Sequence, residues 1–172
     1  VPFTEYRQHY FRYLSEFGFE SFPSEKTVNS FTSPEERNIF SRKMELHQRC
    51  RGGNRKILTY LADTYLYPTD IRYGVEHLRR NRGRCMGALY WQLNDIWPVA
   101  SWASVDYFGR PKALQYAAKR FFAPIMISCA ETGETDTRPY CVMESGYYGY
   151  ETKAALNVTN ETTEPLHAEV IW

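Results

Sequence analysis

The feature that most constrains the fold is a continuous apolar run, CMGALYW, at residues 85–91. A short run with no polar alternation is typical of a parallel strand that is buried on both faces. The polar residues Gln92, Asn94 and Asp95 follow directly, just before Trp97. Because ligands of α/β proteins gather at the carboxyl ends of parallel strands, we expect a functional site where this strand ends.

A second strand is predicted over residues 11–19 (FRYLSEFGF), with Glu16 and Gly18 near its end. A helix is predicted to begin at Ser33, the first residue of a capping box that Glu36 closes, and to run toward Cys50. Helical periodicity recurs in residues 57–66, 71–80 and 112–122. The order strand, helices, strand, helix indicates βα units and a parallel sheet.

The pattern changes after residue 123. Short segments separated by turn residues replace the helical pattern, and residues 153–159 and 167–172 alternate roughly between apolar and polar side chains. This is typical of antiparallel β-structure in a sandwich. The sequence therefore predicts an α/β unit over residues 1–123 and a β unit over residues 124–172.

Aromatic residues are unusually frequent: 14 Tyr, 10 Phe and 4 Trp make up 16% of the 172 residues. Rings with one polar edge suit a cleft that grips a sugar, or an interface with other protein layers. The net charge of +1 gives no indication of nucleic-acid binding. The longest nearly apolar run, residues 121–130, is too short to span a membrane. The four cysteines form no CxxC pair and no grouping with histidine, so we expect free thiols and no metal site.

Glu16 and Trp91 therefore stand at two predicted strand ends. A carboxylate beside an aromatic wall resembles a glycosidase subsite, in which the ring stacks on the sugar and the carboxylate attacks or stabilises the anomeric carbon. The alternative is a buried structural acid bonded to the backbone. Spacing alone does not choose between the two.

Three long segments carry a resemblance to a known family. They are residues 14–24 (LSEFGFESFPS), 90–102 (YWQLNDIWPVASW) and 105–124 (VDYFGRPKALQYAAKRFFAP), with shorter matches at residues 44–48 (MELHQ) and 76–80 (EHLRR). In this order they resemble the β-mannosidase branch of glycoside hydrolase family 2, over about residues 1–124. Residues 125–172 resemble, more loosely, the sandwich domain that follows the barrel in that family.

The resemblance implies a fold and an activity. The fold would be the C-terminal portion of a (β/α)8 TIM barrel over residues 1–123, followed by a partial, Ig-like β-sandwich over residues 124–172. The activity would be that of a retaining glycosidase that hydrolyses terminal β-D-mannosyl residues by double displacement. No metal or organic cofactor is implied, and the expected partners are a carbohydrate substrate and the rest of a longer parent chain.

The resemblance also assigns roles to residues. Glu16 matches the family nucleophile, and Trp91 matches the floor of the subsite that holds the attacked sugar. Asn94 and Asp95 match polar residues that we expect at the pocket mouth. Trp97 is expected to line an outer subsite or to pack against a neighbouring domain.

Two positions depart from the family pattern. The family acid/base is a Glu preceded by Asn on an earlier strand, and the Asn-Glu pair here, Asn160–Glu161, falls in the sandwich-like segment. We therefore expect the acid/base to lie upstream, outside this chain, and the chain alone to be inactive, with Asp95 as the rival within it. Glu20 stands where the family usually has Gln, and is either a tuning substitution or a solvated surface acid.

Other functions stay open at this stage. A β-galactosidase or β-glucuronidase of the same family would share the fold, and a non-catalytic carbohydrate-binding or interaction module would keep the sugar cleft without the chemistry. We expect no nucleic-acid or membrane partner, and the oligomeric state is open. The expected location is cytoplasmic for a bacterial protein, and lysosomal or secreted for a eukaryotic one.

Overall fold

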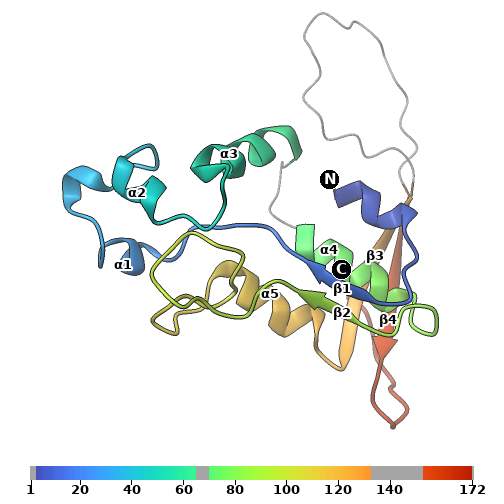
Figure 1. Ribbon diagram of the computed structural model, residues 1–172. Helices are drawn as coiled ribbons and strands as arrows, with labels where there is room; N and C mark the ends of the chain where they lie inside the picture. The colour runs from blue at the N-terminus through green and yellow to red at the C-terminus, as the bar shows by residue number, and fades with distance from the viewer. Residues whose placement is uncertain (1–2, 65–69, 133–152, 172) are drawn as a thin grey trace, which may run out of the picture.

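Two small sheets organise the computed structural model, which describes residues 3–64, 70–132 and 153–171 (Figure 1). The first sheet pairs β1 (Leu14–Phe17) with β2 (Ala88–Tyr90), and the second pairs β3 (Ile125–Thr132) with β4 (Lys153–Asn160). The helices of the described chain are η1 (Phe3–Gln8), α1 (Glu25–Val28), η2 (Pro34–Glu36), α2 (Arg42–Leu46), α3 (Gly53–Thr64), α4 (Asp70–Arg80) and α5 (Ala113–Phe121), where η marks a 3₁₀ helix.

The β1–β2 sheet is parallel, as the sequence predicts, with Leu14 opposite Ala88 and Phe17 opposite Tyr90. Helices α4 and α5 lie on one side of it (Figure 1). On that side Phe17 and Tyr90 pack against a core that includes Val75 of α4 and Phe121 of α5. The helices therefore cover one face of the sheet, and the other face is open within the described chain.

The prediction that residues 85–91 are buried on both faces is wrong for this chain. Leu89, in the middle of β2, is 53% exposed, and Met86 just before the strand is 69% exposed. Neighbouring residues of a strand point to opposite faces. Since Tyr90 faces the helices, Leu89 faces the uncovered side of the sheet.

The single helix predicted from Ser33 toward Cys50 is also wrong, although its start is correct. The Ser33 N–H donates to Glu36 Oε2 at 3.0 Å, and only the 3₁₀ helix η2 follows. Ser41 then begins α2, because its hydroxyl accepts the Met44 N–H at 3.2 Å while it donates to the Glu36 carbonyl at 2.7 Å. A second N-capping serine thus divides the predicted helix in two.

Helices α3, α4 and α5 agree with the periodicity, whereas the sequence pattern does not predict η1 and α1. Helix α3 begins at Gly53, whose φ of 61° is in the left-handed region. The Glu45 carboxylate accepts the Asn54 N–H at the helix start. Helix α4 begins at Asp70, and α5 matches the segment predicted over residues 112–122. Residues 65–69, which include the predicted stop at Pro68, lie outside the described residues.

The β3–β4 sheet is antiparallel, as predicted for this part of the chain, and pairs residues from Ile125 opposite Asn160 to Thr132 opposite Lys153. Met126 and Ser128 are buried on one face. Met126 shares the core of Val75 and Phe121, so the predicted boundary near residue 123 runs through one packed cluster and stays a prediction.

The second alternating segment, residues 167–172, is not a strand over its described part. Residues 161–171 are exposed throughout, and in the described chain they pair with neither sheet. Strand alternation needs a partner edge and a surface to cover before it becomes a strand. Trp172 lies outside the described residues.

Candidate active site at the strand ends

Glu16 and Trp91 lie at the same edge of the parallel sheet. Glu16 is an exposed residue of β1, and Trp91 follows β2 directly with 48% of its surface exposed. The Trp91 N–H donates to the Phe17 carbonyl at 2.8 Å, so the backbone beside Glu16 is bonded to the backbone of the ring. The pairing register shifts between Leu14 and Phe17, and the adjacent Ser15 and Glu16 are both exposed, whereas Phe17 packs toward the helices. The two side chains that the sequence analysis selected are thus brought to neighbouring strand ends.

Gly18 is part of this site, and the sequence analysis gave it no role beyond marking the strand end. A Cβ on Gly18 would lie 2.2 Å from the Trp91 carbonyl oxygen and 3.3 Å from Trp102 Cδ1. The backbone after Glu16 therefore approaches the Trp91 peptide so closely that only glycine fits. The same contact places Trp102 beside the site, and the Gln92 N–H donates to the Trp102 carbonyl at 3.1 Å.

Asn94 and Asp95 differ sharply in exposure. Asn94 is exposed and forms a bridge with Val105, whereas Asp95 is 5% exposed and accepts the Ser101 hydroxyl at 2.9 Å. Burial raises the pKa of Asp95 above its ordinary value. Of the two, Asn94 has the exposure that contact with a ligand requires, and the substrate-binding role of both stays a prediction.

Trp97 lies away from the strand ends, in a cluster of rings. Its ring centroid is 5.1 Å from that of His47, which stacks on Phe31 at 3.9 Å. His47 Nδ1 also lies 2.6 Å from the Pro98 carbonyl. These contacts all lie within the unit predicted over residues 1–123, so the outer-subsite role of Trp97 and its packing against a neighbouring domain both stay predictions.

Glu20 is buried, so the interpretation as a solvated surface acid is wrong. Its side chain is 6% exposed, its Oε1 has no hydrogen-bond partner in the described chain, and the backbone of Cys50 lies near the carboxyl group. Burial raises the pKa of Glu20 to about 7, although the ammonium groups of Lys112 and Lys56 oppose the shift. The carboxyl group therefore changes charge near neutral pH, which the Gln usual in the family cannot do.

Lys112 lies in the same buried region, at the N-cap of α5, and is 5% exposed. Its ammonium donates to the carbonyls of Ser21 at 2.9 Å and Ser101 at 3.0 Å. Burial lowers the pKa of Lys112 to about 8, and the nearby carboxylates of Asp95 and Glu20 limit the shift. Nothing in the sequence pattern singled out this lysine, because a basic residue at a helix start is ordinarily solvated.

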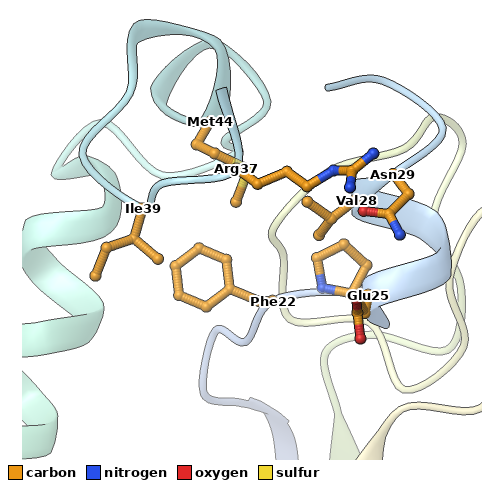
Figure 2. A pocket seen from close by; sticks show the side chains of 8 residues that line it. Phe22, Glu25, Val28, Asn29, Arg37, Ile39 and Met44 are labelled. Atoms are coloured by element: carbon orange, nitrogen blue, oxygen red, sulfur yellow. The ribbon is translucent and has the colours of Figure 1, made fainter. Parts of the chain in front are cut away.

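A separate pocket of about 400 Å³ lies among α1, η2 and α2 (Figure 2). Figure 2 shows the apolar side chains of Phe22, Ile39 and Met44 beside Val28, with the polar groups of Arg37 and Asn29 at one side. Its lining is Phe22, Pro23, Glu25, Val28, Asn29, Arg37, Ile39 and Met44. None of the predicted site residues lines this pocket.

Residues 3–64, 70–132 and 153–171 contain neither a metal-ligand cluster nor a membrane-spanning helix. These residues hold no group of three or more His, Cys, Asp or Glu side chains that could bind a metal ion. None of their helices is long and apolar enough to cross a membrane. Cys50, Cys85 and Cys129 are free thiols; Cys85 is buried, Cys50 and Cys129 are only partly buried, and Cys141 lies outside the described residues.

Comparison with known proteins identifies the class first. No protein-family model matches the chain. In structure it is similar to a glycosidase, the β-D-mannosidase of Dictyoglomus thermophilum, with a TM-score of 0.70 and 24% identity. The match covers 96% of this chain and 25% of that one, and at this identity it shows a shared fold.

The sequence relatives specify the branch. The chain is 39% identical over 135 residues to β-mannosidase B of Aspergillus terreus and 38% identical to that of Aspergillus niger. Each match covers 67% of this chain, which spans only 16% of the length of either relative. The resemblance to β-mannosidases predicted from the motifs is confirmed: the chain is similar to a segment of these glycoside hydrolases.

Proposed function

We propose that this chain is the part of a retaining β-mannosidase that supplies the nucleophile, Glu16, and the sugar platform, Trp91. The observation that carries the proposal is the parallel β1–β2 pair, which presents an exposed carboxylate and a half-exposed indole at adjoining strand ends. A carboxylate that attacks a sugar must be accessible, and a ring that stacks on the sugar must have a free face. The relatives named β-mannosidase B support mannose as the sugar.

The proposal extends to the fold. In this view β1 and β2 are the last two strands of a (β/α)8 barrel, with α4 and α5 outside and the open face of the sheet turned to the barrel interior. The exposed Leu89 and Met86 support this, because the missing barrel strands would cover such side chains. Strands β3 and β4 would begin the β-sandwich domain. This chain spans only 16% of the length of the relative, so the rest of both domains would lie elsewhere in the parent protein.

In the proposed mechanism, a Glu16 oxygen attacks the anomeric carbon and the bond from that carbon to the leaving oxygen breaks. An acid/base carboxyl gives its proton to the leaving oxygen, and a glycosyl ester of Glu16 remains. Water then attacks the same carbon, the acid/base takes the water proton, and Glu16 is released with the sugar configuration retained.

The acid/base is proposed to lie in the parent chain before residue 1. Retaining enzymes hold their two carboxyl groups about 5–5.5 Å apart, both facing the sugar. The rival within this chain, Asp95, is 5% exposed and bonded to Ser101, which disfavours contact with a sugar. We therefore expect residues 1–172 alone to lack hydrolase activity.

The test is hydrolysis of aryl β-mannoside, β-galactoside and β-glucuronide by the full-length protein, compared side by side. We expect release from the mannoside to exceed the other two by about a hundredfold or more in kcat/KM. A preference for galactoside or glucuronide would keep Glu16 as nucleophile and overturn the substrate. Sugar binding without hydrolysis of any of the three would favour a carbohydrate-binding module.

A further inference from the structure

The buried ammonium of Lys112 lies where the segments that follow β1 and β2 meet. Ser21 belongs to the segment after β1, and Ser101 to the segment after β2. The Ser21 N–H donates to the Ser101 carbonyl at 2.8 Å, and the Ser101 N–H donates to the Ser21 carbonyl at 3.1 Å. Lys112 Nζ donates to both of these carbonyls, at 2.9 and 3.0 Å. Lys112 therefore joins the segment that follows β1 to the segment that follows β2.

This junction continues into the strand ends without a break. On the β1 side, Gly18 precedes Ser21 in the chain, and its backbone packs against the Trp91 carbonyl. Phe17, the residue before Gly18, accepts the Trp91 N–H at its carbonyl. Glu16 is the next residue back along the chain. A shift at Ser21 and Ser101 would therefore be passed directly to the backbone that carries Glu16 and Trp91.

We propose that Lys112 is a positioning residue that clamps the ends of β1 and β2 together and so sets the placement of Glu16 relative to Trp91. The proposal rests on the function proposed above for those two side chains. Lys112 itself touches neither of them, and it acts through the carbonyls of Ser21 and Ser101.

The charges around the ammonium explain why a lysine is needed there. Asp95, Glu20 and Asp106 all stabilise its charged form. Other charged groups face the same acids: Lys56 and Glu45 near Glu20, and Arg49 near Asp95. An apolar side chain of the same length would remove the Lys112 cation from three buried acids and leave each carbonyl with one donor fewer.

The test measures amide hydrogen exchange in the full-length protein with Lys112→Met, and uses Lys119→Met as the matched control. Lys119 is an exposed lysine on the same helix. We expect the Trp91, Ser21 and Ser101 amides to exchange at least about tenfold faster in Lys112→Met, with the α4 amides unchanged. Unchanged protection of the Trp91 amide would overturn the clamp.

A second variant, Lys112→Met with Glu20→Gln, guards against a simple failure to fold, because it removes one buried acid together with the cation. Its Trp91 amide should still be deprotected, and wild-type protection there would overturn the proposal.

Steady-state kinetics distinguish a positioning role of Lys112 from a role in protein stability alone. We expect kcat for aryl β-mannoside to fall about tenfold or more in the folded variant, with KM within about threefold of wild type. Equal turnover in a folded variant would overturn the positioning role. If the wild type hydrolyses no β-mannoside, the proposed function fails, while the exchange rates still decide whether Lys112 holds the strand ends.

Discussion

Glu16 and Glu20 lie close together on the same stretch of chain, yet their surroundings are opposite. Glu16 is an exposed residue near the end of β1. Glu20 is 6% exposed and lies near the backbone of Cys50 and the ammonium of Lys112. The first carboxylate is available to a ligand, and the second is committed to contacts within the protein.

The comparison shows that an acid near a strand end is not by itself a catalytic candidate. Up to Phe17 the chain is held by the β1–β2 pairing, in which Ser15 and Glu16 are exposed. After Gly18 the chain passes between the segments around Cys50 and Ser101, and its side chains become enclosed. The close contact at Gly18 therefore separates the accessible site from its buried support.

The largest expected effect comes from exchanging each acid for its amide. In the full-length protein, Glu16→Gln should lower kcat for aryl β-mannoside by about a thousandfold or more, because an amide cannot form the glycosyl ester. Glu20→Gln should stay within about tenfold of wild type, since it removes a charge from the support and not from the site. Melting temperatures close to wild type for Glu16→Gln would show that the loss is chemical. Retention of a tenth or more of wild-type turnover by Glu16→Gln would remove it from the role of nucleophile.

Gly18 lies between the accessible site and its buried support, so a substitution there tests how the two are separated. Gly18→Ala should lower the free energy of unfolding by about 3 kcal/mol, because the new methyl group would meet a backbone oxygen that no side-chain rotation can move away. Gly87→Ala is the matched control. The three atoms nearest to a Cβ there all belong to the ring of Tyr13, a side chain that is 53% exposed and that can rotate, so we expect a loss below about 1 kcal/mol. Urea denaturation measures both, and equal losses would show that the Gly18 contact is not limiting.

The elements with strong local patterns were predictable. The parallel pairing of β1 with β2, the helices α4 and α5 and the antiparallel pair after residue 124 all agree with periodicity and strand-end arguments. The helix expected from Ser33 failed for a local reason, since Ser41 offers a second N-cap that competes with continuation. The segment at residues 167–171 failed for a non-local reason, because within the described chain no strand edge receives it.

The candidate site also has a part that the sequence predicts and a part that it does not. Neighbouring strand ends bring Glu16 and Trp91 together, and the sequence order of two parallel strands is enough to predict that. The burial of Glu20 depends on Cys50 and Lys112, which are distant in sequence and converge only in the fold. No motif spacing contains that information, so the supporting cluster could be found only in the structure.

The smallest predicted effect is the part of the pH dependence of stability that Glu20 contributes. Its pKa is about 7 in the folded protein and 4.5 as an ordinary glutamate, so the folded state holds the proton more tightly. The free energy of unfolding of the wild type should therefore fall as pH rises from about 4.5 to 7, by about 1–3 kcal/mol, and Glu20→Gln should lack this fall. Lys112, with a pKa of about 8, stays charged across most of that window and does not produce the same slope. Urea titrations at pH 4.5, 6 and 7.5 give the difference between the two proteins. Parallel curves would mean that Glu20 is solvated and that the contrast with Glu16 is not one of burial.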